Sequence, residues 1–126
     1  MKDPVVSENA PKPIGPYSQG IRTKELIFCS GQIGVDSKTS ELARGVVAQT
    51  AQSLMNLRTV LSAAGLDLSN VVKTTVFMTD LSEFSLMNEE YAKHFSAPFP
   101  ARSTVQVAAL PRGGRVEIEA IAVRSS

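Results

Sequence analysis

Residues 116–123, V-E-I-E-A-I-A-V, alternate in the manner of a β-strand and carry two carboxylates inside an apolar run. Because successive side chains of a strand point to opposite faces, this stretch has one aliphatic face and one mixed face. The aliphatic face comprises Val116, Ile118, Ala120 and Ala122, and the mixed face comprises Glu117, Glu119, Ile121 and Val123. Neither face is cleanly polar, so we expect both faces to be covered.

The segments around this strand predict a sheet with two helices. The β-branched stretch V-V-K-T-T-V-F-M-T predicts a central strand, and the apolar run L-I-F-C-S predicts a strand buried on both sides. Residues 1–16, with four prolines, are expected to be irregular. The expected order is strand 17–22, strand 26–31, helix 45–64, strand 71–79, a helix from Asp80, strand 101–108 and strand 115–124.

The two helices show apolar side chains at steps of three and four residues. Gly65 follows the first helix and suits the left-handed stop position. Asp80 and Glu83 predict a capping box at the start of the second helix. The first apolar stripe comprises Val47, Ala51, Leu54, Leu57, Leu61 and Ala64, and the second comprises Phe84, Met87, Tyr91 and Phe95.

These elements predict an α+β fold in a single domain, residues 1–126. Right-handed crossovers place both helices on one face of one sheet. Two helices leave the other sheet face without a cover from its own chain. We therefore expect that face to contact another subunit in a homo-oligomer.

Composition excludes several classes of function. The formal net charge is +1, with 13 basic and 12 acidic residues spread along the chain, which argues against a nucleic-acid or membrane-surface binder. One cysteine, Cys29, cannot form an intrachain disulfide, and one histidine, His94, leaves little for a metal site or a Ser-His-Asp triad. The N-terminus lacks the apolar region of a signal peptide, and no apolar run approaches membrane-spanning length, so we expect a cytoplasmic protein.

Arg102 and Glu119 are the leading candidates for chemistry. Alternation places Arg102 and Thr104 on one face of their strand, where the guanidinium could bind a small carboxylate bidentately. The apolar neighbourhood of Glu119 favours a general acid or base, and Glu117 on the same face is a weaker candidate. An ion pair between Arg102 and Glu119 with a purely structural role is the competing interpretation.

Three further positions are secondary candidates. Tyr17, in I-G-P-Y-S-Q-G, could donate to a substrate or orient water, or it could simply pack under a loop. The dipeptide Ser30-Gly31 could expose a backbone N–H to a ligand or simply bend a strand end. Asn88 could reach a cleft edge from the second helix, or it could be a solvated helix position.

The residues also resemble a known family. The segments I-G-P-Y-S-Q-G, F-C-S-G-Q-I, K-T-T-V-F-M-T-D-L, F-P-A-R-S-T-V-Q-V and V-E-I-E-A-I-A-V together are similar to the Rid family of reactive-intermediate deaminases. The likeness runs from about residue 9 to residue 124 and is strongest to the RidA subgroup. The combination of segments is specific, although no single segment is.

The resemblance implies a chorismate-mutase-like fold and a homotrimer with clefts between subunits. It implies hydrolysis of 2-iminopropanoate and 2-iminobutanoate, formed from enamines that pyridoxal-phosphate-dependent serine/threonine dehydratases release, to 2-keto acids and ammonia. It also implies that no metal or cofactor takes part.

The resemblance further implies roles for individual residues. Arg102 would bind the substrate carboxylate with the Gly31 N–H, Glu119 would shuttle a proton, and Tyr17 would position substrate or water. Ser30, Asn88 and the Thr104 backbone would line the site. Thr104 departs from the cysteine common in the subgroup, which removes any property that depends on a thiol.

Three competing functions remain. The protein could be a non-catalytic sensor that binds 2-keto acids in the same cleft. It could be an RNA-acting translation inhibitor, an activity linked to some Rid relatives, although the near-neutral charge weighs against RNA binding. It could also be a chaperone-like interaction protein.

Overall fold

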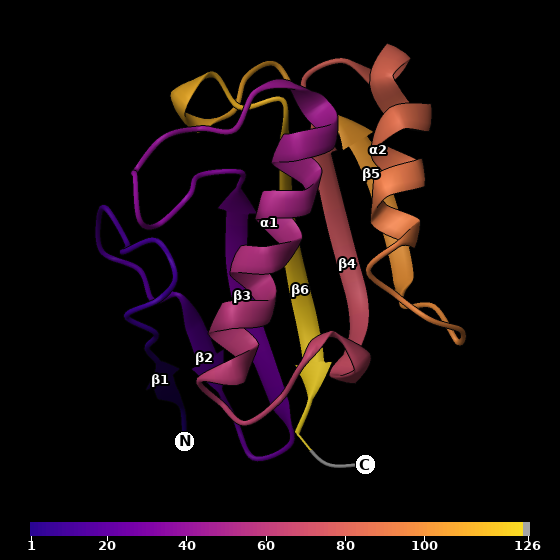
Figure 1. Cartoon of the computed structure of the whole chain (residues 1–126). Coiled ribbons are helices and arrows are strands. Elements are labelled where there is room, and N and C mark those ends of the chain that lie inside the picture. The colour runs from indigo at the N-terminus through magenta and orange to yellow at the C-terminus, as the bar shows by residue number, and fades with distance from the viewer. Residues whose placement is uncertain (125–126) are drawn as a thin grey trace.

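The computed structural model describes residues 1–124, which form one six-stranded sheet with two helices on the same face (Figure 1). The strand order is β1-β2-β3-β6-β4-β5, and every neighbouring pair is antiparallel except the parallel pair β4–β5. The strands are β1 (Asp3–Val5), β2 (Gly20–Arg22), β3 (Leu26–Ile33), β4 (Val71–Met78), β5 (Ala101–Gln106) and β6 (Val116–Val123), and the helices are α1 (Gly45–Ser62) and α2 (Phe84–Ala92). The predicted α+β arrangement is confirmed.

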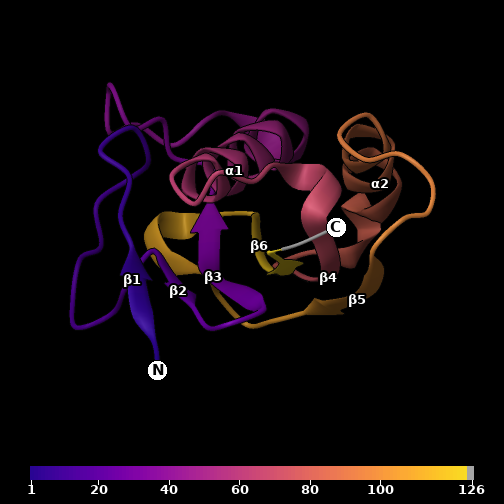
Figure 2. The same ribbon diagram turned by 90° about the horizontal axis from the view of Figure 1, so that it is seen from below.

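Both helices lie on one side of the sheet, so the sheet has a helix face and an open face (Figure 2). The alternation predicted for β6 is confirmed, because Val116, Ile118, Ala120 and Ala122 are all at most 3% exposed beneath the helices. Their neighbours in the strand lie on the open face. The central strand β6 therefore contributes one set of side chains to the core and the alternate set to the open face.

The α1 helix packs its aliphatic side chains onto the sheet. Leu54, Leu57 and Leu61 are fully buried, as predicted, but Val47 is 42% exposed. Val46 takes the place that the sequence pattern assigned to Val47. Gly65 follows the helix with a φ of +77°, which confirms the left-handed stop.

The start of the second helical segment differs from the predicted capping box. The Asp80 carboxylate accepts a hydrogen bond from the Ser82 N–H and caps a short 3₁₀ turn, Leu81–Glu83, that precedes α2. The Glu83 carboxylate instead accepts from the Arg115 side chain at 2.8 Å. Glu83 is thus drawn away from the helix start because a cation from the segment before β6 competes for it.

Two further predictions were wrong in detail. Residues 3–5 form a short edge strand, because Pro4 sits at the sheet edge where its missing N–H is tolerated. β3 is not buried on both sides, since Phe28 is 43% exposed on the open face. Among residues 1–124, segments of the chain cover the helix face of β3 and leave its open face uncovered.

The open face carries apolar side chains among a few polar ones. Ile21, Phe28 and Ile121 are register neighbours across β2, β3 and β6. Val105, on β5, is 42% exposed and lies in line with Phe77 and Glu117. An apolar sheet face of this kind is typical of a protein contact surface. Among residues 1–124 no helix has the length and hydropathy needed to cross a membrane.

Candidate functional site

Arg102 lies on the helix face of β5, beside α2. Its register partner on β4 is Thr74, which is 1% exposed beneath the helices. The Arg102 guanidinium carbon lies 4.8 Å from the centre of the Tyr91 ring and 5.5 Å from the centre of the Phe84 ring. The cation is therefore held against aromatic rings of α2.

Arg102 has no carboxylate partner within residues 1–124. The alternative of an Arg102–Glu119 ion pair is wrong for the single chain, because the two residues lie on opposite faces of the sheet. Glu119 is the register partner of Thr75, which neighbours the buried Thr74 and points the other way. A half-buried guanidinium without an anion favours the binding of one from outside the chain.

Asn88 and Thr104 accompany Arg102. Helical spacing puts Asn88 four residues after Phe84 and three before Tyr91, on the stripe of α2 that carries both rings. Thr104 shares the helix face of β5 with Arg102, and its hydroxyl is buried without a hydrogen-bond partner among the described residues. The predicted grouping of Arg102 with Thr104 on one face is confirmed.

Tyr17 and Gly31 meet elsewhere, in a cavity of about 430 Å³ that Glu117 and Arg112 also line. The loop before β2 is fixed by Gln19, whose side-chain amide donates to the Ser7 carbonyl at 3.0 Å and whose oxygen accepts from the Ser7 N–H at 2.7 Å. Tyr17 lies in this loop and is 52% exposed. A phenol in this position is available to a ligand in the cavity.

Gly31 lies in an irregularity of β3, where the pairing with β6 shifts between Cys29 and Gln32. A β-carbon at Gly31 would stand 2.9 Å from the Glu117 side-chain carboxyl carbon. The absence of a side chain at Gly31 thus leaves room for that carboxyl group against the strand.

Glu117, the weaker of the two carboxylate candidates in the sequence analysis, is the one that lines this cavity, whereas Glu119 does not. Burial, reinforced by the charge of Glu119, raises the pKa of the Glu117 carboxyl above its ordinary value. The residue is half-buried and shares its cavity with Tyr17 and Gly31. Alternation had placed Glu117 and Glu119 on one face, but the residues that close the cavity come from distant segments, so strand periodicity could not separate the two.

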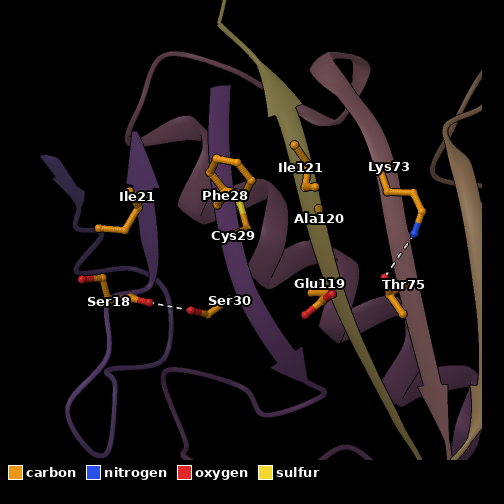
Figure 3. Close-up of a pocket in the computed structure, with 10 residues that line it drawn as sticks. All are labelled: Ser18, Ile21, Phe28, Cys29, Ser30, Lys73, Thr75, Glu119, Ala120 and Ile121. Carbon is orange, nitrogen blue, oxygen red and sulfur yellow. Dashed lines mark hydrogen bonds between the residues drawn. The ribbon is translucent and has the colours of Figure 1, made fainter. Parts of the chain in front are cut away.

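Glu119 lines a second hollow, of about 400 Å³, on the open face (Figure 3). Figure 3 shows its carboxylate between β3 and β4, with Lys73 and Thr75 on β4 and Ser30 on β3. The Ser30 hydroxyl donates to the Ser18 carbonyl at 2.6 Å. The structure therefore separates two pairs of predicted residues: Ser30 lies with Glu119, whereas Gly31 lies with Tyr17.

Polar side chains of α1 fix the backbone beyond Gly31, which the sequence analysis did not identify. The buried hydroxyl of Ser53 donates to the Gln32 carbonyl, and the Asn56 amide donates to the carbonyls of Ile33 and Val35. Gln49 accepts from the Arg115 N–H at 2.7 Å. Gln49, Ser53 and Asn56 recur at steps of three and four residues in α1, on its buried side. This spacing was the signal in the sequence that could have identified them.

Two further side chains with potential reactivity are those of Cys29 and His94. Burial raises the pKa of the Cys29 thiol to about 12, so the sulfur stays protonated at neutral pH. A ring nitrogen of His94 lies 2.8 Å from the Glu90 carboxylate one turn earlier in α2. Within residues 1–124 no three His, Cys, Asp or Glu side chains gather as metal ligands.

Comparison with known proteins gives the family. The model of the Endoribonuclease L-PSP family matches residues 7–124, and the chain therefore belongs to that family. The 2-iminobutanoate/2-iminopropanoate deaminase of Bos taurus is 50% identical over 121 residues, covering 95% of this chain and 88% of the relative. The deaminase of the same name from Escherichia coli strain K12 is 49% identical over 127 residues, covering 98% and 99%.

Solved structures give the same fold. The E. coli protein TdcF with bound serine superposes with a TM-score of 0.92 at 43% identity, covering 98% of this chain and 99% of that one. The resemblance to the Rid family and its deaminases that the sequence indicated is thus confirmed.

Proposed function

We propose that this protein hydrolyses 2-iminobutanoate and 2-iminopropanoate to the corresponding 2-keto acids and ammonia. Relatives from cattle and from E. coli that are about half identical over nearly the whole chain carry the name of this activity. The structural observation that carries the proposal is Arg102, a half-buried cation held by two rings and without an anionic partner in residues 1–124. A small imino acid supplies the missing carboxylate.

Arg102 binds the substrate carboxylate, with Asn88 beside it. The planar guanidinium matches a carboxylate with two parallel hydrogen bonds, and such charge-assisted contacts contribute about 1.5–3 kcal/mol. A relative that binds serine, which is itself a small molecule with a carboxylate, supports a substrate of this size. The backbone N–H of Gly31 and the Thr104 backbone remain proposed further contacts.

The complete site forms between two copies of the chain. Arg102 lies on the helix face at the β5 edge, whereas Tyr17, Gly31 and Glu117 line a cavity on the other side of the sheet. One chain cannot present both groups to one small molecule. A chorismate-mutase-like homotrimer, in which open faces pack together, brings the β5 edge of one subunit to the cavity of the next. The apolar open face supports this assembly.

The reaction needs positioning and one proton relay. Water attacks the C2 carbon of the protonated imine, the C=N π electrons move to nitrogen, and one water proton passes to the ionised Glu117 carboxylate, which gives the neutral carbinolamine. Glu117 then returns this proton to the amine nitrogen. The C–N bond breaks as the carbinolamine hydroxyl gives its proton back to the carboxylate and the C=O bond forms, and ammonia leaves with the 2-keto acid. A positioned acid–base group of this kind contributes about 10²–10⁴-fold.

Tyr17 orients the water or the substrate from the opposite wall of the cavity. The sequence favoured Glu119 as the proton carrier, and that role stays a prediction. In the proposed mechanism, Glu119 instead raises the pKa of Glu117 through its charge. We further propose that the protein works in the cytoplasm, beside the dehydratases whose unstable products it consumes.

The test couples a threonine dehydratase to imine loss with and without the protein. Faster formation of 2-oxobutanoate from the imine supports the proposal, and Arg102→Ala should abolish the acceleration. An unchanged rate of imine loss in the presence of the wild-type protein would reject it. Binding of 2-oxobutanoate without turnover would instead favour a sensor of small acids.

The description of the matching family favours RNA cleavage as a second candidate. The formal net charge of +1 gives weak general attraction for phosphates. Cleavage of a labelled single-stranded RNA that survives Arg102→Ala and falls steeply with salt would support it.

A further inference from the structure

The surface of α2 that faces β5 presents two aromatic rings to Arg102. The guanidinium carbon lies 4.8 Å from the Tyr91 ring centre and 5.5 Å from the Phe84 ring centre. Cations within about 6 Å of a ring centre are attracted to the ring face. The two rings, which are separated by two turns of α2, thus restrict where the guanidinium can lie.

The Tyr91 ring is itself held from two sides. Its hydroxyl lies 2.7 Å from the Thr74 hydroxyl, in a buried hydrogen bond between α2 and β4. The Phe95 ring lies against it, with centroids 4.6 Å apart. Burial raises the pKa of Tyr91, so the phenol stays protonated and keeps the hydrogen bond at neutral pH. Tyr91 is 5% exposed and fixed in place.

Thr74 is also the register partner of Arg102 in the parallel pair β4–β5. The Thr74 hydroxyl contacts the Tyr91 hydroxyl, and the Tyr91 ring contacts the Arg102 guanidinium. Thr74 lies on β4, which pairs with the central strand β6, and Arg102 lies on the next strand, β5. A rigid strand therefore fixes the ring, and the ring fixes a long flexible side chain.

We propose that Tyr91 is a positioning residue that sets the plane and place of the Arg102 guanidinium before a carboxylate arrives. The inference rests on the proposed function in that it assigns Arg102 to the substrate carboxylate. Bidentate recognition depends on the orientation of the planar fork, and an arginine that is already ordered loses less rotamer freedom on binding. Tyr91 then acts on substrate binding and not on the proton relay.

The first test compares Tyr91→Leu, which removes the ring, with Tyr91→Phe, which keeps it. We expect Tyr91→Leu to raise KM about tenfold and to leave kcat within about twofold, because a cation–π contact is lost but the relay groups are intact. Tyr91→Phe should raise KM only about threefold. Phe95→Leu removes a ring that supports Tyr91 but does not contact Arg102, so it should raise KM less than Tyr91→Leu does.

The second test separates positioning from stability. Tyr91→Phe leaves the buried Thr74 hydroxyl without its hydrogen-bond partner, and Thr74→Val does the same to the Tyr91 hydroxyl. Each single variant should therefore lower Tm. The double variant removes both hydroxyls, so its Tm should recover toward that of the wild type. KM should remain raised in the double variant, because the bond that fixes the ring is still absent. A KM that returns to the wild-type value together with Tm would show a merely structural role and overturn the proposal.

The dissociation constant of 2-oxobutanoate, measured by calorimetry for each variant, separates this proposal from the deaminase proposal. If wild-type protein binds 2-oxobutanoate but does not accelerate imine loss, the deaminase proposal fails and the binding series still decides the role of Tyr91. Equal affinity of folded Tyr91→Leu and wild type would overturn the positioning role. An absence of binding and turnover in the wild type would overturn both.

Discussion

The guanidinium of Arg102 rests on the rings of Phe84 and Tyr91, and no carboxylate among residues 1–124 pairs with it. We predict that Arg102→Lys raises KM for the imine about tenfold or more, because a point charge replaces a bidentate fork. Arg102→Ala should raise KM further while Tm changes little. Steady-state kinetics across substrate concentrations make the measurement, and a wild-type KM in Arg102→Ala would contradict the assignment.

The two carboxylates of β6 are expected to behave differently. Glu117→Gln should lower kcat by about 10²–10⁴-fold, since the proton carrier is lost. Glu119→Gln should retain most of kcat. Equal losses from the two substitutions, or a larger loss from Glu119→Gln, would return the relay to Glu119.

The pH dependence gives a second distinction between these carboxylates. The ionised form of Glu117 accepts the proton, so activity should rise with pH through its raised pKa, above the ordinary value of about 4.3 for glutamate. Because the Glu119 charge contributes to that shift, Glu119→Gln should move the acidic limb of the pH–rate profile to lower pH. A limb that stays in place would show that the charge of Glu119 does not reach the relay.

At the residue scale, the sequence could identify candidate residues but not which of them lie together in one cavity. Arg102 was a candidate because an arginine within a strand needs an anion, and Tyr17 and Gly31 were candidates because they lie in short motifs near glycines. Alternation gave Glu117 and Glu119 the same face. The choice between them depends on the loop before β2 and on the bend at Gly31, which come from distant segments.

At the scale of the element, two glycines near the end of β3 have different tasks, Gly31 within the strand and Gly34 directly after it. A β-carbon at Gly34 would lie 2.6 Å from the Cα atom of Gln49, in the backbone of α1, whereas one at Gly31 would meet the flexible side chain of Glu117. We predict that Gly34→Ala lowers the free energy of unfolding by about 1–3 kcal/mol, because the helix must shift.

Gly31→Ala should change stability little but lower kcat, since the displaced carboxyl group is the proposed relay. Denaturant unfolding and steady-state kinetics on both variants make the comparison, each serving as the control for the other. Loss of stability from Gly31→Ala with an unchanged kcat would contradict these roles.

Element prediction succeeded where a local signal was strong. Gly65 and the alternation of β6 determined a helix end and a strand face, whereas Val47 was assigned to the core because the stripe could be drawn one residue to either side. The capping box failed because Arg115, more than thirty residues from Glu83, competes for the carboxylate. Such competition leaves no trace in a local pattern.

At the scale of the molecule, the proposed trimer assembles through the open face. We predict that Val105→Asp shifts the proposed trimer toward monomer, because it buries a charge in an apolar contact. Val47→Asp is the matched control, since both valines are 42% exposed but Val47 lies on α1, away from the open face. Light scattering at micromolar concentration makes the measurement. Dissociation by both variants, or by neither, would contradict an assembly through the open face.

The uncovered sheet face followed from the sequence, because two helices cannot cover both sides of one sheet. The separation of Arg102 from Tyr17 and Glu117 did not, because it depends on strand order, and β6 inserts between β3 and β4 although it comes last in the chain. The most direct test of a site shared between copies is therefore subunit complementation. Arg102→Ala and Glu117→Gln chains, each inactive alone, are unfolded, mixed in equal amounts and refolded together.

If one copy supplies Arg102 and its neighbour supplies Glu117, roughly a quarter of the sites in random mixtures have both intact groups, and that share of wild-type activity should return. If both groups act within one chain, every site in the mixture retains a defect. Mixed oligomers that form but stay inactive would contradict the shared site.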